Sequence, residues 1–375
     1  MNIELIPLIV GLIVFIASLI SLRLGISVAI IEILLGSIAG NLGLETQGWM
    51  TYLAGFGGII LTFLAGTEID IKLMKDKFKV NFLIGFFSFI TPFLLVVAYV
   101  LFLLKWSVNA SLIAGIALST TSLAVVYSVL VETGLNKLEI GKMIMAATFI
   151  TDIGTAIALS VIFIKPDLYT ALFYAVSIVL IILINRFSLF ILRNKRMSGK
   201  MIEPEIKFIF LVLLIFIYFA KLGEGHAILP AFILGILMSK HFKEQRKTSK
   251  IGIKLRTVAY AIITPLFFIV GGMKISYTLI LSSFVLFIIL FALKIIAKFA
   301  GVYFFAKKYI PAGSTYTTLL MSTGLTFGTI SSMFGLQAGY INQAQYSVLV
   351  GVVVASAVIP TFIAQQWFKP KHTEY

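Results

Sequence analysis

Asp152 is a lone carboxylate in the middle of an apolar run that extends from about Ile140 to Ile164. Thr148, Asp152 and Thr155 are spaced i, i+4 and i+7, so they share one face of a predicted helix. A carboxylate at the centre of a membrane span costs about 2.5–3.5 kcal/mol or more unless it has water, a partner or an ion. We therefore expect Asp152 to bind a cation or a proton. A carboxyl group that is hydrogen-bonded for helix packing is the alternative.

Two lysines also interrupt an apolar run. Lys294 and Lys298 lie between Phe284 and Phe305, and their i, i+4 spacing places them on one face of a helix. A lysine beside an intramembrane aspartate can hold a cation site together when the cation is absent. Alternatively, Lys294 is neutralised inside the protein and Lys298 extends toward the cytoplasmic end of the span.

Two short polar segments lie near the middle of apolar runs. One is Ser119-Thr120-Thr121-Ser122, and the other is Ser322-Thr323-Gly324 followed by Leu325-Thr326. Ser and Thr side chains compete for backbone hydrogen bonds, and Gly weakens a helix. We therefore predict two interrupted helices, whose free carbonyls and half-helix ends lie beside Asp152. A packing seam of small residues is the alternative.

The composition determines the class of protein that positions these residues. The chain has 375 residues, of which 60% are hydrophobic and 12% charged, and its mean hydropathy is 1.08. These values predict an all-α membrane protein that crosses the bilayer many times. Cysteine is absent and the three histidines are scattered, which excludes thiol catalysis and a clustered Cys or His metal site.

Charged or Gly/Pro/Asn-bearing breaks separate the apolar runs into thirteen predicted spans. They lie near residues 3–22, 26–44, 49–68, 81–104, 108–132, 140–164, 169–193, 205–222, 226–240, 256–273, 278–304, 314–336 and 345–368.

The net charge of +15 is unevenly distributed. Of the 30 basic residues, 24 fall in connections on one side of this topology, and the opposite side has only Lys105, Lys165, Lys221 and Lys274. The positive-inside rule then predicts an external N-terminus and a cytoplasmic C-terminus. The charge reflects topology, so we expect no nucleic-acid partner.

Three sequence matches relate the two halves of the chain. Glu32-Ile-Leu-Leu-Gly36 resembles Ala231-Phe-Ile-Leu-Gly235, and Gly66-Thr-Glu68-Ile resembles Gly272-Met-Lys274-Ile. The third match joins the two polar segments at Ser119 and Ser322. Each match crosses seven spans, an odd number, so the halves are predicted to have opposite orientations in the membrane. This inverted-repeat plan is typical of secondary transporters.

Several segments resemble the monovalent cation/proton antiporter superfamily, in the branch of prokaryotic Na⁺/H⁺ exchangers and Kef-type K⁺ efflux systems. The segments that carry the resemblance begin at Phe63, Ala117, Gly141 and Pro265. The resemblance implies a homodimer of thirteen-helix subunits in the plasma membrane of a prokaryote. It also implies a scaffold formed by residues 1–80 and 201–275, a mobile core formed by 81–168 and 276–375, and a linker helix in 169–200.

The resemblance also assigns roles to single residues. Asp152 matches the aspartate that binds the ion, and Lys298 matches the basic residue of the eleventh helix better than Lys294 does. The remaining matches are possible ligands of the ion or proton: Thr148, Thr151, Thr121, Ser122 and Glu68. Relatives that move net charge have an acid where this chain has Thr151, so we expect one cation to be exchanged for one proton, without cofactors. The alternative is that Lys298 releases its proton when Na⁺ binds and regains it afterwards, which would carry a second proton and make the exchange electrogenic.

The combined prediction is a Na⁺ (or Li⁺)/H⁺ antiporter that works by alternating access, because a site of oxygen ligands suits Na⁺ and its carboxylate can bind a proton instead. K⁺/H⁺ exchange of the Kef type is the main alternative. A cation channel would need a continuous pore. A membrane enzyme would depend on His226, which has no partner at motif spacing.

Overall fold

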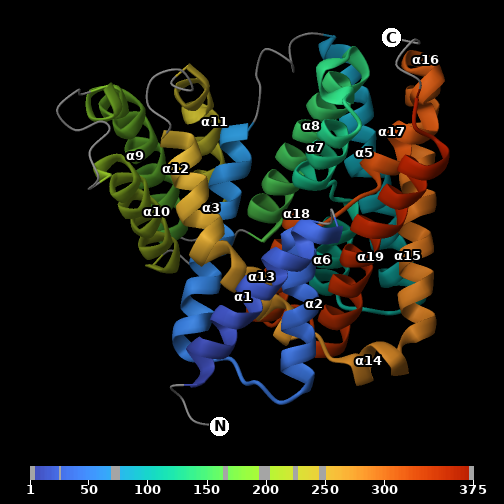
Figure 1. The fold of residues 1–375 in the computed structure, drawn as a ribbon, viewed down its shortest axis with the longest axis horizontal. Helices are drawn as coiled ribbons and strands as arrows, with labels where there is room; N and C mark the ends of the chain where they lie inside the picture. Colours follow the sequence, from blue (N-terminus) through green and yellow to red (C-terminus); the bar gives the residue numbers. More distant parts are fainter. Residues whose placement is uncertain are drawn as a thin grey trace. The chain divides into compact units, whose positions relative to one another are not determined.

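The computed structural model describes residues 5–24, 27–68, 77–163, 168–193, 203–222, 227–244 and 251–370. In these ranges the chain is built from helices without strands, which confirms the predicted all-α class. The helices are α1 (Leu5–Leu24), α2 (Val28–Asn41), α3 (Gly48–Glu68), α5 (Phe78–Ala98), α6 (Val108–Ser119), α7 (Leu123–Glu132), α8 (Glu139–Ile162), α9 (Leu168–Arg193), α10 (Pro204–Leu222), α11 (Ile228–Glu244), α12 (Ile251–Val258), α13 (Thr264–Met273), α14 (Tyr277–Ser282), α15 (Phe284–Lys298), α16 (Phe304–Tyr309), α17 (Ser314–Met321), α18 (Thr326–Gln337) and α19 (Gln343–Trp367) (Figure 1).

Many of the described helices are apolar enough to lie in a membrane. Nine segments are long and apolar enough to cross a bilayer, and α2, α11 and the Ala171–Ile184 part of α9 are shorter apolar helices. A further apolar helix, α10, carries Glu205 and Lys207 near its start and Lys221 near its end. The multi-pass all-α class is confirmed, and the number of thirteen spans stays a prediction.

The eleventh span differs from its predicted bounds of 278–304. Its first residues form the separate helix α14, which the hydroxyl of Ser276 caps by accepting a hydrogen bond from the backbone N–H of Leu279. Ser283 then separates α14 from α15 with φ −111° and ψ 25°. The span itself runs from Phe284 to Tyr309, because a π-helical turn joins α15 to α16. Hydroxyl capping, which hydropathy does not report, shifts the start of the span.

The chain divides into two compact units. Unit 1 consists of residues 1–46, 71–155 and 268–375, and unit 2 consists of residues 47–70 and 156–267. Asp152, Lys294 and Lys298 all belong to unit 1.

Glycines bring helix backbones into contact within each unit. In unit 1, a Cβ atom built on Gly36 of α2 would overlap the backbone of α13, and one built on Gly272 of α13 would overlap that of α2. In unit 2, Gly66 of α3 and Gly235 of α11 are related in the same way. The sequence repeat matches Gly36 with Gly235 and Gly66 with Gly272. The α2–α13 contact therefore has its counterpart in the α11–α3 contact, as an inverted repeat requires.

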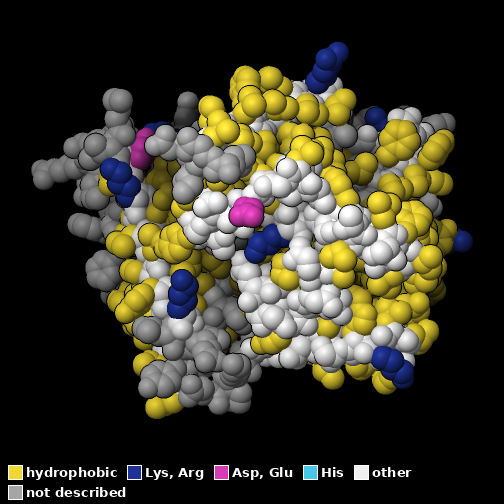
Figure 2. Space-filling model, turned by 90° about the horizontal axis from the view of Figure 1, so that it is seen from below, with side chains coloured by type: hydrophobic (Ala, Val, Ile, Leu, Met, Phe, Trp, Pro, Cys, Tyr) yellow, Lys and Arg dark blue, Asp and Glu magenta, His cyan; other side chains and the backbone are white. Residues whose placement is uncertain are grey.

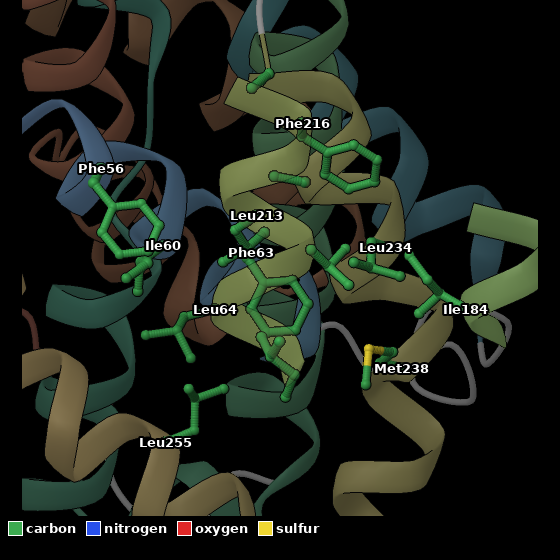
Figure 3. Close-up of a cluster of buried hydrophobic side chains, with 14 of the residues drawn as sticks. Phe56, Ile60, Phe63, Leu64, Ile184, Leu213, Phe216, Leu234, Met238 and Leu255 are labelled. Carbon is green, nitrogen blue, oxygen red and sulfur yellow. The ribbon is translucent and has the colours of Figure 1, made fainter. Parts of the chain in front are cut away.

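The interior of unit 2 is a cluster of apolar side chains. Phe63 and Leu64 of α3 pack there with Leu213 and Phe216 of α10 and Leu234 of α11 (Figure 3). Lipid is as apolar as these side chains, so the cluster stabilises the unit through close packing.

The exterior is apolar over large areas. Leu12 and Phe15 in α1 and Phe304 in α16 are exposed. Figure 2 shows many apolar side chains and few charged ones on one face. Exposed apolar side chains on long helices are expected of surfaces that contact lipid, which agrees with a multi-pass membrane protein.

Candidate functional site

The first interrupted helix consists of α6 and α7. Ser119 Oγ donates a hydrogen bond to the Ile116 carbonyl at 2.9 Å, and Thr120 Oγ1 donates to the Ala117 carbonyl at 3.0 Å. Thr120 has extended backbone angles, φ −64° and ψ 156°. The two hydroxyls occupy carbonyls that another helical turn would use. The predicted interruption is confirmed, and its hydroxyl residues explain it.

The second interrupted helix consists of α17 and α18. Ser322 Oγ donates to the Thr318 carbonyl at 2.7 Å, and Thr323 Oγ1 donates to the Leu320 carbonyl at 2.7 Å. Leu325, the residue before α18, has φ −151° and ψ −77°. This predicted interruption is confirmed as well, and it follows the same hydroxyl chemistry as the first.

The two interruptions are in direct contact. Thr121 Oγ1 donates to the Met321 carbonyl at 2.9 Å, and the Ser122 backbone N–H donates to Thr323 Oγ1 at 3.3 Å. The C-terminal ends of α6 and α17 and the N-terminal ends of α7 and α18 therefore meet. Half-helix ends carry partial charges, negative at C-termini and positive at N-termini. The crossing can thus interact with ions of either sign.

Lys298 lies at the first interruption. Its side chain is fully buried. Its Nζ atom donates to Ser88 Oγ at 2.8 Å, to the Ser119 carbonyl at 2.7 Å and to Thr121 Oγ1 at 3.0 Å. The three N–H groups of an ammonium thus have three acceptors. Because the Ser119 carbonyl ends α6, Lys298 stabilises the negative end of that half-helix.

Lys294 lies one helical turn earlier and is also fully buried. A Cβ atom built on Gly324 would overlap its Nζ atom and would lie 2.9 Å from Thr120 Oγ1 and 3.4 Å from Ser356 Oγ. The Lys294 side chain therefore ends at the second interruption. The two lysines of α15, which the sequence places on one face, reach different interruptions.

Asp152 lies in α8 and is only 3% exposed. One turn earlier on the same helix, Thr148 Oγ1 donates to the Ile144 carbonyl at 2.9 Å and to Met321 Sδ at 3.5 Å. This face of α8 therefore borders the end of α17. An electrostatic interaction also links Asp152 to Lys298. The structure thus brings Asp152 and Thr148 together with the crossing.

Thr151 has a different environment. Its hydroxyl donates to the Gly85 carbonyl of α5 at 3.1 Å and to the Ala147 carbonyl at 3.2 Å. Gly85 allows this approach, because a Cβ atom there would overlap the Ala147 carbonyl. Thr151 therefore joins α8 to α5.

The sequence did not single out three residues of this region. Ser88 accepts a hydrogen bond from Lys298, Met321 contacts Thr121 and Thr148 through different atoms, and Ser356 of α19 lies near Gly324. Ser88 and Ser356 are single hydroxyl residues in apolar helices. Such serines are common in membrane helices, so the sequence gives only a weak indication of their role. Met321 contributes its backbone carbonyl and sulfur, and its side-chain type gives no sign of either role.

The described structure gives no position for the side chains of two residues considered from the sequence, Glu68 and His226. Glu68 is the last residue of α3 in unit 2, and its side chain is outside the described part. His226 lies outside the described residues.

The chemistry available here is that of oxygen ligands and charge. Among the described residues, no group of three or more His, Cys, Asp or Glu side chains could hold a metal ion. Asp152 supplies a carboxylate, and the crossing supplies hydroxyl and carbonyl oxygens. Such ligands suit hard cations.

A buried carboxylate and two buried lysines beside crossing interrupted helices, in a fold with inverted repeats, define a membrane protein of the secondary-transporter class. A protein-family model described as "Sodium/hydrogen exchanger, transmembrane" matches residues 11–369. The chain belongs to this family. It is therefore a transporter rather than an enzyme.

Relatives and a solved structure agree with this assignment. The chain is 27% identical to the probable Na(+)/H(+) antiporter 3 of Methanocaldococcus jannaschii, over 92% of this chain and 90% of the relative. It is 26% identical to a Na(+)/H(+) antiporter of Enterococcus hirae, over 94% and 95%. The structure of the sodium proton antiporter MjNhaP1 from M. jannaschii matches the fold with a TM-score of 0.68 at 13% identity, covering 98% of this chain and 100% of that one.

Proposed function

We propose that the protein exchanges Na⁺ or Li⁺ for H⁺ across the membrane, and that cation and proton compete for Asp152. The observation that carries this proposal is the burial of Asp152 on a helix that contacts the crossing through Thr148 and Met321. A carboxylate in such a place needs a positive ligand. The names of the relatives, which are Na(+)/H(+) antiporters, support Na⁺ as the cation.

Oxygen atoms close to Asp152 are the proposed further ligands. Thr148 is one turn away on α8, and Thr121 and Ser122 belong to the interruption that contacts Met321. Thr151 already donates to α5, which supports a role in positioning α8. We propose that Lys298 holds the crossing together when no cation is bound, because it joins the middle of α5 to the ends of α6 and α15 through hydrogen bonds.

Coupling of the two flows requires alternating access. We propose that the core, residues 81–168 and 276–375, moves when Asp152 holds a cation or a proton and stays in place when the carboxylate is bare. The scaffold of residues 1–80 and 201–275 would then form a homodimer, with the N-terminus outside and the C-terminus in the cytoplasm. Residues 1–46 belong to the same compact unit as most of the proposed core. A measurement of which segments move together during transport would assign residues 1–46 to the scaffold or to the core.

The test is exchange in proteoliposomes with Na⁺, Li⁺ and K⁺ across a pH series. Asp152→Asn should abolish exchange and preserve folding, because it removes the shared ligand and keeps the volume. Ser160→Ala is a control on the same helix, since it removes a buried polar group two turns beyond Asp152, and it should exchange at the wild-type rate.

Three results would contradict the proposal. Sodium/proton exchange by Asp152→Asn near the wild-type rate would remove Asp152 from the mechanism. Exchange of K⁺ in preference to Na⁺ would assign a different cation. Cation flux without proton counterflow would indicate a channel.

A further inference from the structure

Two threonines on the same face of α8 as Asp152 differ in the partners of their hydroxyl groups. Thr148 precedes Asp152 by four residues and Thr155 follows it by three. Both threonines are fully buried, and each hydroxyl donates to the backbone carbonyl four residues earlier at 2.9 Å. Within the described part of the chain, only the Thr148 hydroxyl also has an acceptor on another helix, which is the sulfur of Met321 at 3.5 Å.

The position of Met321 is fixed by its backbone and by packing. It is the last residue of α17 and is fully buried. Its carbonyl accepts a hydrogen bond from Thr121 of the first interruption at 2.9 Å. Met321 and Leu320 belong to an apolar cluster that also contains Ile144 of α8. A methionine side chain is flexible by itself, but these contacts hold the sulfur beside the Thr148 hydroxyl.

The acceptors of the Thr148 proton determine where its oxygen lone pairs can be used. A hydroxyl group has one proton and two lone pairs, and a hydroxyl that binds a cation must direct its proton elsewhere. The Ile144 carbonyl lies one turn before Thr148, whereas Asp152 lies one turn after it, so a proton donated to this carbonyl points away from Asp152. A proton donated to the Met321 sulfur is likewise not donated to the carboxylate.

The chemistry of sulfur suits this role. A thioether is a weak hydrogen-bond acceptor, and it is a poor ligand for a hard cation such as Na⁺ or Li⁺. The Met321 sulfur can therefore accept the proton of Thr148 without competing with the Thr148 oxygen for the cation.

We propose that Met321 is a positioning residue of the exchanger. Its sulfur accepts the hydroxyl proton of Thr148, so that the Thr148 oxygen presents its lone pairs to a Na⁺ or Li⁺ ion at Asp152. This inference rests on the proposed function of Asp152, and it adds a residue of α17 that acts on the cation through Thr148.

Met321 also connects the affinity of the cation site to the arrangement of the crossing. Its carbonyl is bonded to Thr121 and its sulfur to Thr148, so one residue contacts both the first interruption and α8. An arrangement in which the end of α17 moves away from α8 would remove the sulfur acceptor and lower the affinity for the cation.

The first experiment measures how exchange in proteoliposomes depends on Na⁺ concentration, at an alkaline pH where protons compete least for Asp152. Met321→Leu removes the acceptor and nearly keeps the volume. The KM for Na⁺ should rise about three- to fivefold while kcat changes less than about twofold, because a weak hydrogen bond that supports cation binding is lost. Met143→Leu is the matched control and should keep the wild-type KM. It makes the same change in the same apolar cluster, five residues before Thr148 and so on a different face of α8.

The second experiment repeats the comparison without the hydroxyl group. Thr148→Val removes the proton donor and keeps the shape of the side chain. In a protein that already carries Thr148→Val, the added Met321→Leu substitution should change the KM less than about twofold, because the two residues act through one hydrogen bond. Calorimetric titration of the purified protein with Na⁺ gives the same comparison for a variant that binds without transporting.

An unchanged KM for Na⁺ in Met321→Leu would overturn the role of Met321. The same fold increase with and without Thr148→Val would also overturn it, because the effect would then not depend on the hydroxyl. In both cases loss of exchange in Asp152→Asn would still support the proposed function. Exchange by Asp152→Asn near the wild-type rate would overturn the proposed function and the role of Met321 together.

Discussion

The two interrupted helices are similar in sequence and in their own hydrogen bonds, yet each has a different relation to the rest of unit 1. The α6–α7 interruption depends on a side chain from another helix, since Lys298 bonds the Ser119 carbonyl. The α17–α18 interruption satisfies its final carbonyls with Ser322, Thr323 and Thr121. Lys294 lies beside it without a hydrogen bond in the described structure.

This difference indicates that two interruptions with similar sequences can have different relations to the lysines of α15. A lysine that completes a hydrogen-bond network stabilises the framework, because removing it leaves buried acceptors without donors. Lys294 lies beside carbonyls that already have donors, so its removal would leave none of them unpaired. The comparison therefore distinguishes the two lysines by their partners, although their sequence context is nearly the same.

The largest effect is expected for Lys298→Met. The substitution keeps the apolar stem and removes the donors to Ser88, Ser119 and Thr121. We expect a loss of roughly 2–4 kcal/mol in stability, because buried acceptors are left unpaired, together with loss of exchange. Thermal unfolding in detergent measures the first effect and proteoliposome assays the second. A melting temperature equal to that of Lys294→Met would erase the distinction between the two lysines.

An intermediate effect is expected for Gly324→Ala. The added methyl group would overlap Lys294 Nζ and crowd Thr120 Oγ1, and overpacking of this kind costs about 1–3 kcal/mol. Gly324→Ala should reduce exchange in the otherwise wild-type protein. In a protein that already carries Lys294→Ala, the added Gly324→Ala substitution should change exchange much less. Equal losses in the two backgrounds would show that Lys294 does not fill the space beside Gly324.

The smallest effect is expected for Thr121→Val, which removes the hydrogen bond to the Met321 carbonyl and one acceptor of Lys298. The expected loss of stability is about 1 kcal/mol, with a greater loss of Na⁺ affinity if the hydroxyl is a ligand. Thr318→Val is the control, because the Thr318 hydroxyl bonds only within α17. Equal losses of stability and Na⁺ affinity in the two variants would show that the contact between the interruptions contributes no more than a hydrogen bond within α17.

Much of the architecture could be predicted from the sequence. Apolar runs and breaks predict thirteen spans, because a bilayer imposes a length and an apolar composition on each helix. The hydroxyl residues at Ser119 and Ser322 predict the interruptions for a local reason, competition for carbonyls. The start of the eleventh span was wrong because the Ser276 cap gives α14 a helix of its own.

The partners across the crossing could not be predicted in the same way. The two lysines have the same type, the same helix face and nearly the same neighbours along the chain. Their different partners depend on where α5, α6 and α17 place Ser88, Ser119 and Gly324. Contacts such as Lys298 with Ser88, 210 residues apart, arise from packing and have no periodic signal.

The contact between Gly36 of α2 and Gly272 of α13 has a mechanical consequence. Sliding between packed helices requires side chains that can pass over one another by changing rotamers. At these glycines one backbone rests directly on the other, and backbone atoms have no rotamers to change. We therefore expect α2 and α13 to move together as one rigid body. Any conformational change during transport must then occur at other positions of the chain.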